Sequence, residues 1–211
     1  MSQATKDKIL DIAERLFGEQ GYESTSLRQI IFEAGVNLAA VHYHFGSKEE
    51  LLDAIVLRGA VPLNEARIAL LDRYEKESAP NPVPVENVLR AVLLPTFRLQ
   101  DHNPQFVKLM GQLHGEGLMP AMVKRHFQPL VDRFMSALRR SLPDLPPGEL
   151  FWRVQFMFGA MAQVLRGPFL LQAPEGFAEP TDADEMSERL VQFVAAGFQV
   201  PVRLPATLQE K

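Results

Sequence analysis

Residues 24–50, STSLRQIIFEAGVNLAAVHYHFGSKEE, contain the pattern that decides the fold. Ser26 begins a capping box, and the short helix that follows it should end at Gly35 in a left-handed conformation. Asn37 is a good N-cap for a second short helix, which should end at Gly46. Two short helices joined by a tight turn form a helix-turn-helix, whose second helix can enter the major groove of DNA.

Helical periodicity continues along almost the whole chain, and no stretch alternates between apolar and polar residues as a strand would. Pro95 should kink the helix that contains it, and the residues from Pro201 onward show no periodicity. We therefore expect an all-α fold. The expected helices cover about residues 9–17, 27–34, 38–45, 47 onward, 63–77, 85–100, 104–115, 119–141, 148–167 and 182–200.

The chain has 211 residues, with 22 lysines and arginines against 26 aspartates and glutamates, a formal net charge of −4. An acidic protein cannot coat nucleic acid by bulk charge alone, so any DNA binding must rely on a small surface. The absence of cysteine excludes disulfides, a thiol nucleophile and cysteine-ligated metals. There is no signal-peptide pattern, and the most apolar stretch, residues 156–165, is too short to span a membrane. We therefore expect a cytoplasmic protein without a membrane partner.

The second helix of the motif carries side chains suited to close contact with DNA. Residues 38–40 (Leu, Ala, Ala) are small or apolar and can approach base edges, and residues 42–44 (His, Tyr, His) can hydrogen-bond to bases or phosphates. Within the motif only Glu33 opposes Arg28 and Lys48, so the local charge is 2 − 1 = +1 before the histidines are counted. The expected DNA surface is locally positive although the whole chain is acidic.

The span 9–52 resembles the N-terminal domain of the TetR family of transcriptional regulators. The matching residues are Ala13, Phe17, Gly21, Tyr22, Thr25, Ser26, Ile30, the Ala34-Gly35-Val36 turn and the run from Tyr43 to Leu51. The resemblance implies a helix-turn-helix domain at residues 1–50, whose connecting helix starts at residue 48. It also implies a ligand-binding and dimerisation domain at residues 51–200, followed by a tail at 201–211.

The resemblance also assigns DNA contacts residue by residue. Positions that hold phosphates correspond to Thr25, Ser26, Tyr43, His44 and Lys48, and positions that face bases correspond to Arg28, Leu38, Ala39, Ala40 and His42. The chain departs from the family at His42, where the family most often has Tyr. Asn37 replaces the commoner Ser, a neutral exchange because both side chains accept the same backbone N–H bond.

The C-terminal part is rich in large, soft side chains that form either an ordinary core or an apolar ligand cavity. The candidate ligand-binding residues are Phe97, Phe106, Met110, Leu113, His114, Met122, His126, Phe127, Phe134, Trp152 and Phe156. The segments FVKLMG (106–111) and LPPGELFWRVQFMFGA (145–160) resemble a TetR subgroup that includes regulators of fatty-acid metabolism. This resemblance implies a small apolar effector, a fatty acid or an acyl-CoA.

The last two expected helices are apolar around more of their circumference than one core stripe needs. The candidate dimer-interface residues are Phe158, Met161, Val164, Leu165, Leu190, Phe193, Val194 and Phe198. The family resemblance implies that two such helices from each subunit form a four-helix bundle. The resulting homodimer would place two recognition helices about 34 Å apart on a pseudo-palindromic operator of double-stranded DNA.

The sequence contains no constellation typical of catalysis, so we expect a regulator and not an enzyme. His102, His114 and His126 are twelve residues apart, a spacing that does not align them on one helix face, and we expect no metal and no cofactor. The predicted function is a ligand-responsive regulator, a repressor that its effector releases from DNA. The alternative is an all-α carrier of lipids or small molecules, or an enzyme, without a DNA-binding role.

Overall fold

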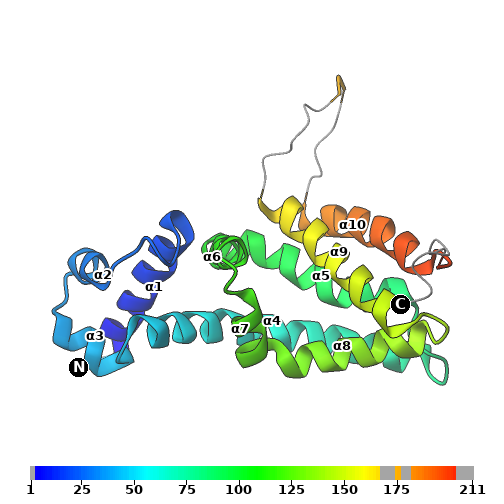
Figure 1. Ribbon diagram of the computed structural model, residues 1–211, viewed down its shortest axis with the longest axis horizontal. Coiled ribbons are helices and arrows are strands. Elements are labelled where there is room, and N and C mark those ends of the chain that lie inside the picture. The colour runs from blue at the N-terminus through cyan, green and yellow to red at the C-terminus, as the bar shows by residue number, and fades with distance from the viewer. Residues whose placement is uncertain (1–2, 167–173, 177–181, 203–211) are drawn as a thin grey trace, which may run out of the picture. The chain divides into compact units, whose positions relative to one another are not determined.

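The computed structural model describes residues 3–166, 174–176 and 182–202, and within these ranges it contains helices and no strand (Figure 1). The expected all-α fold is confirmed. In chain order the helices are α1 (Gln3–Gln20), α2 (Leu27–Ala34), α3 (Leu38–Phe45), α4 (Lys48–Ser78), α5 (Val85–His102), α6 (Pro104–Gly115), α7 (Met119–Met122), the π-helical turn η1 (Val123–Phe127), α8 (Gln128–Ser141), α9 (Pro147–Arg166) and α10 (Ala183–Gln199).

The ends of the first helices confirm the capping pattern. Ser26 Oγ accepts a hydrogen bond from Gln29 N at 3.2 Å, and Asn37 Oδ1 accepts one from Ala40 N at 2.9 Å. Gly35 ends α2 with φ of 60°, in the left-handed region that favours glycine. These caps depend only on residues three or four positions apart, which is why the sequence predicts them well.

Two helices differ from the sequence expectation. α4 runs without a break through Pro62 for 31 residues, because Ala60 and Leu63 on either side of the proline are buried and hold the helix together. The predicted single helix 119–141 is interrupted by η1. This is a π-helical turn, in which backbone hydrogen bonds join residues five positions apart instead of four. Its insertion changes the direction of the side chains that follow.

The chain forms two compact units, and α4 begins in one and ends in the other. Unit 1 is Met1–Arg67 with Arg98–Val131, and unit 2 is Ile68–Phe97 with Asp132–Lys211. This division differs from the predicted boundary at residue 50, because α6, α7 and η1 pack with the N-terminal helices. The helix-turn-helix therefore belongs to a larger unit than the sequence motif alone covers.

Unit 1 is held together by a close approach of α1 and α6 (Figure 1). A Cβ atom at Gly18 would lie only 3.3 Å from Gln105 O and from Leu109 N, so the helix backbones meet where α1 has no side chain. Phe17 and Leu109 are fully buried beside this contact. The absence of a side chain at residue 18 thus sets the distance between α1 and α6.

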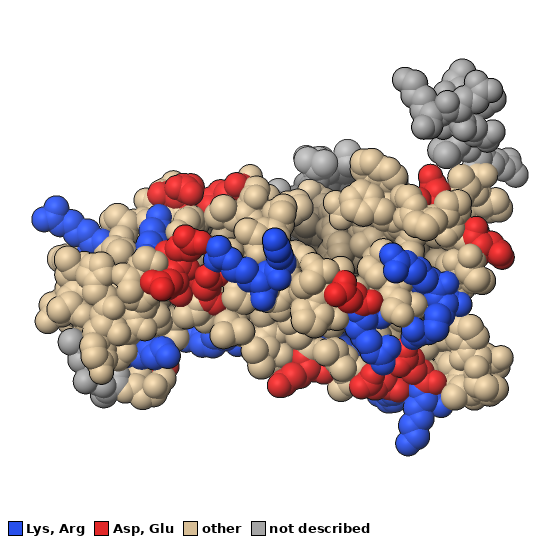
Figure 2. All heavy atoms as spheres, turned by 60° about the horizontal axis from the view of Figure 1, so that its bottom comes forward, with Lys and Arg blue, Asp and Glu red and all other residues tan. Residues whose placement is uncertain are grey.

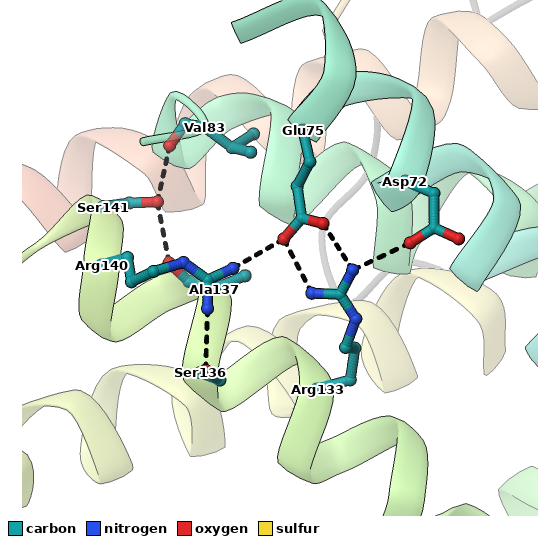
Figure 3. A network of polar contacts seen from close by, with 8 residues as sticks. All are labelled: Asp72, Glu75, Val83, Arg133, Ser136, Ala137, Arg140 and Ser141. Carbon is teal, nitrogen blue, oxygen red and sulfur yellow. Dashed lines mark hydrogen bonds and ion pairs between the residues drawn. The ribbon is translucent and has the colours of Figure 1, made fainter. Parts of the chain in front are cut away.

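Within unit 2, arginine side chains form ion pairs between helices. Arg133 on α8 donates to Glu75 Oε1 on α4 at 2.7 Å and to Asp72 at 2.8 Å, and Arg140 donates to Glu75 at 2.6 Å (Figure 3). Arg90 on α5 makes a two-pronged contact with Glu188 on α10, with both N–O distances at 2.8 Å. Such paired geometry orients the helices that the apolar core brings together.

Helices α9 and α10 lie side by side in unit 2 (Figure 1). Arg153 on α9 donates to the carbonyl oxygens of Phe198 at 2.7 Å and Val200 at 2.8 Å. These carbonyls at the end of α10 have no partner within their own helix, so a charged donor satisfies them.

Candidate DNA-binding site

The interior of the helix-turn-helix is mostly apolar. It also contains the hydroxyl group of Thr25, which we predicted from the sequence to contact a DNA phosphate. Ile30, Ala34 and Val41 are buried, and so is Thr25, whose side chain is only 1% exposed. Thr25 Oγ1 donates to Gly21 O at 2.8 Å. This hydroxyl is buried and bonded within the chain, and its contact with phosphate stays a prediction.

Helix α1 braces α2 through polar contacts. Arg15 forms an ion pair with Glu33 and donates to Glu19 Oε2 at 2.9 Å, while Gln29 Nε2 donates to Gln20 Oε1 at 3.1 Å. The hydrogen bond to Glu33 raises the pKa of Arg15 above its ordinary value. The contacts fix the orientation of α2, and with it the position of the turn.

The surface left exposed is polar at α2 and mixed at α3. We call Ser26, Arg28, Leu38, Ala39, His42 and Tyr43 the exposed motif surface, since all six are exposed to solvent. Ala40 is 4% exposed and packs into the interior, and its contact with bases stays a prediction. Its small size lets α3 sit close to the helices beneath it.

The ring side chains of α3 differ in their surroundings. His42 Nδ1 lies 2.6 Å from the carbonyl oxygen of Gly46, so this exposed ring is held by a hydrogen bond to the end of its own helix. His44 is half-buried, its ring meets that of Tyr43 edge-on at 5.2 Å, and its Nε2 atom has no hydrogen-bond partner among the described residues. This Nε2 atom is itself buried and is not exposed to solvent.

Lys48 is the first residue of α4 and is half-buried. Its ammonium group lies 4.2 Å from the centre of the Tyr22 ring and 5.9 Å from that of Phe17, which are cation–π distances. Burial, followed by the charge of Glu49, raises the pKa of Tyr22. The two rings therefore fix the position of the Lys48 ammonium group at the N-terminus of α4.

On the face that Figure 2 shows, the charged side chains of the described residues do not gather into one basic surface, because acidic and basic groups lie next to one another. In unit 1, Arg58 pairs with Asp11 and Glu14, and Arg125 pairs with Glu49 and Asp53. Arg28 forms no ion pair with the described residues, so its charge remains available to a ligand.

The structure also exposes a residue that sequence reasoning missed. Phe32 is 85% exposed on α2, one helical turn after Arg28. The helical periodicity could have predicted this exposure. Residues 28 and 32 both lie opposite the buried positions 30 and 34 on a helix of 3.6 residues per turn. Phe32 therefore extends the surface of α2 beyond the arginine.

Six of the eleven predicted ligand-binding residues are buried, two are half-buried and three are exposed. Trp152 is 56% exposed, Phe156 is 67% exposed and His114 is also exposed in the single chain, and their place in a ligand cavity stays a prediction. The buried candidates are Phe97, Phe106, Leu113, Met122, Phe127 and Phe134, while Met110 and His126 are half-buried.

The predicted dimer-interface residues also differ in how deeply they are buried. Leu190, Val194 and Phe198 are buried within the chain's own core, and their place in a dimer interface stays a prediction. Phe193 is 73% exposed on the opposite side of α10, and Phe158 is half-buried. The remaining candidates Met161, Val164 and Leu165 are half-buried on α9.

Comparison with known proteins identifies the class. Residues 9–55 match the description "Bacterial regulatory proteins, tetR family", and residues 90–197 match "Tetracyclin repressor-like, C-terminal domain". The chain belongs to the TetR family of transcriptional regulators, with the family's helix-turn-helix at its N-terminus. Members of the matched family are DNA-binding regulators without enzymatic activity, so the chain is a regulator and not an enzyme.

Individual relatives show which parts are shared. The chain is 37% identical to the HTH-type transcriptional regulator AcrR of Shigella flexneri over 94 residues, which span 44% of this chain and 40% of AcrR. The structure of the ketosteroid transcriptional regulator KstR2 of Mycobacterium tuberculosis aligns with a TM-score of 0.62 and 21% identity, over 93% of this chain and 96% of that one. The fatty acid degradation regulator FadR of Bacillus halodurans aligns with a TM-score of 0.57 and 16% identity, over 91% and 98%. At these identities the two structures establish a shared fold alone.

Among the described helices, none has the length and apolar character needed to cross a bilayer. The described residues also contain no group of three or more side chains able to hold a metal ion.

Proposed function

We propose that the chain is a homodimeric repressor that a small apolar effector releases from its operator. The observation that carries this proposal is the exposed motif surface: capped, braced helices present Ser26, Arg28 and the side chains of α3 to solvent above an apolar interior. Arg28, with its unpaired charge, is the strongest candidate for reading a base edge in the major groove.

The DNA contacts follow from exposure. We assign Arg28, Leu38, Ala39 and His42 to bases, and Ser26, Tyr43, His44 and Lys48 to phosphates. Thr25 and Ala40 position the helices from the interior instead. Because Arg28 and Lys48 are the only basic residues at residues 24–48, we expect few phosphates to be neutralised and a shallow dependence of affinity on salt.

A second copy of the chain would cover the apolar faces of α9 and α10. Trp152 stacks on Phe156 with ring centres 6.0 Å apart, and both are exposed, as is Phe193 on the neighbouring helix. Large aromatic side chains exposed to solvent favour a protein interface. In a twofold dimer, the same residues of both subunits would be buried at that interface. Gly159 and Gly197 have open space around them, which allows helices of a partner to approach closely.

Contacts within unit 1 offer a route from the effector to the DNA surface. Arg125 in η1 donates to Asp53 at 2.5 Å and to Glu49 at 2.7 Å, and His126 Nε2 lies 3.0 Å from Asp53. Asn64 Nδ2 donates to the carbonyl oxygen of His126 at 3.2 Å. A displacement of η1 would therefore move the start of α4, which follows the recognition helix directly.

The effector is proposed to be a fatty acid or an acyl-CoA. The structural neighbour FadR is described as a fatty acid degradation regulator, and KstR2 as a ketosteroid transcriptional regulator. Both descriptions support an apolar effector for this chain.

A DNA-binding titration tests the proposal. The full chain is titrated against DNA from upstream of its own gene and against random DNA of equal length, with and without a long-chain fatty acid or its acyl-CoA. Preference for the upstream DNA, lost on addition of the effector, is the expected result. Equal affinity for both DNAs would refute the regulator, and lipid binding without any DNA binding would favour a carrier. Only a difference in effector affinity between the two conformations can drive release.

A further inference from the structure

His42 and Gly46 form a reciprocal pair at the end of α3. Gly46 N donates to the carbonyl oxygen of His42 at 3.0 Å, and His42 Nδ1 lies 2.6 Å from the carbonyl oxygen of Gly46. Gly46 has φ of 74°, a conformation that side-chain-bearing residues rarely adopt, and this turns its carbonyl back toward the ring. The histidine ring is thus held by the backbone of the turn that follows it.

This contact determines which ring nitrogen carries hydrogen. A carbonyl oxygen can only accept a hydrogen bond, so Nδ1 must be the donor. In a neutral imidazole the other nitrogen then has a lone pair and no hydrogen. The exposed edge of His42 therefore presents Nε2 as a hydrogen-bond acceptor.

We propose that His42 is a specificity-determining residue that accepts a hydrogen bond from an exocyclic amino group in the major groove, adenine N6 or cytosine N4. This inference rests on the proposed DNA-binding function. The major-groove edges of guanine and thymine carry acceptors, which a lone pair on Nε2 repels. The same lone pair cannot donate to a phosphate oxygen, so the neutral ring reads a base and does not clamp the backbone.

The residue type gives this assignment its selectivity. A tyrosine hydroxyl at the same position could donate or accept by rotating its hydrogen, and would not discriminate between amino and carbonyl groups. The histidine ring has no such rotation while Nδ1 remains bonded to Gly46. One backbone hydrogen bond therefore converts an ambiguous contact into a directional one.

The first test examines the tautomer without DNA. Nitrogen NMR of the ¹⁵N-histidine-labelled full chain, at about pH 8 where histidines are generally neutral, should show His42 with hydrogen on Nδ1 and an unprotonated Nε2. His42→Ala identifies the signal. A spectrum with hydrogen on Nε2 would overturn the inference, whatever the DNA experiments show.

The second test removes single amino groups from the operator. A binding sequence is first selected from random DNA, and each adenine is then replaced by purine and each cytosine by 2-pyrimidinone. For the wild type, one replacement per half-site should weaken binding by about three- to tenfold, the range for a single neutral hydrogen bond. The His42→Ala and His42→Asn variants should be insensitive to that replacement, because neither retains an acceptor at the Nε2 position.

Tyr43→Phe is the matched control, since it alters the neighbouring exposed ring. It should bind all sequences more weakly yet keep the full sensitivity to the amino group. If no sequence is selected at all, the proposed function itself fails. If a sequence is selected but no amino replacement depends on residue 42, or if removal of guanine N7 is the change that depends on it, only this inference is refuted.

Discussion

The ring of Phe106 lies directly against the backbone of Gly59, where a Cβ atom would come within 2.3 Å of Phe106 Cε2. Phe106 is fully buried on α6, and Gly59 is inside α4. The missing side chain therefore lets α6 rest on the helix that follows the DNA-binding motif. This contact joins the two helices as closely as van der Waals radii allow.

Gly59→Ala should destabilise the protein by about 1–3 kcal/mol, the usual cost of overpacking a core. Alanine is favoured over glycine in helices by about 1 kcal/mol, but a rigid buried ring cannot move away, so the clash dominates. Gly111→Ala on α6 is the control: nothing lies within 4 Å of its Cβ position, and the same substitution there should be neutral or stabilising. Urea denaturation measures both. Equal effects would show that the Phe106 contact is unimportant.

Arg28→Ala and Lys48→Ala should separate base reading from phosphate binding. Arg28→Ala should cost about 1–3 kcal/mol on the operator and relax specificity at one position, while Lys48→Ala should weaken all sequences alike. The salt dependence should fall by about 0.9 in log–log slope per lysine removed. Fluorescence anisotropy on operator and random DNA gives all three values. Identical losses on both DNAs for Arg28→Ala would contradict its assignment.

Phe193→Glu should dissociate the proposed dimer. Placing a charge on each copy of an apolar interface should weaken association by about 100-fold or more. Phe32→Glu, which alters another exposed phenylalanine, on α2, should leave the oligomeric state unchanged. Sedimentation velocity at micromolar concentration distinguishes the two. A Phe193→Glu protein that sediments as the wild type does would place the interface elsewhere.

Glu75 should make stability depend on pH in the acid range. Hydrogen bonds and charge from Arg133 and Arg140 lower the pKa of Glu75, so its stabilising effect is complete above the unfolded-state pKa of about 4.3 and is lost as the pH falls through the lower folded-state value. Glu75→Gln should therefore cost about 1 kcal/mol at neutral pH and progressively less below about pH 4.

Glu77→Gln is the control for this measurement, because its partner Arg73 lies 3.6 Å away and both side chains are largely exposed. It should have no measurable effect on the free energy of unfolding. A Glu75→Gln difference that stays constant down to acid pH would show that the carboxylate charge is not its source.

Local chemistry makes the helix-turn-helix predictable from sequence. The Ser26 and Asn37 caps and the left-handed Gly35 depend on neighbours within four residues, and all three are present in the structure. The family resemblance likewise depends on residues in one continuous stretch. The order and type of the helices could therefore be deduced without knowing how they pack.

The sequence by itself determined most of the helices, the caps of the helix-turn-helix and the family, because each is encoded over a short span. Only the tertiary structure decided which apolar residues face inward, since burial depends on helices far away in the chain. Phe193 and Val194 are equally apolar neighbours, yet the first is exposed and the second packs into the core. Thr25 is buried for the same reason, and Pro62 is accommodated because packing on either side outweighs the backbone hydrogen bond that proline removes.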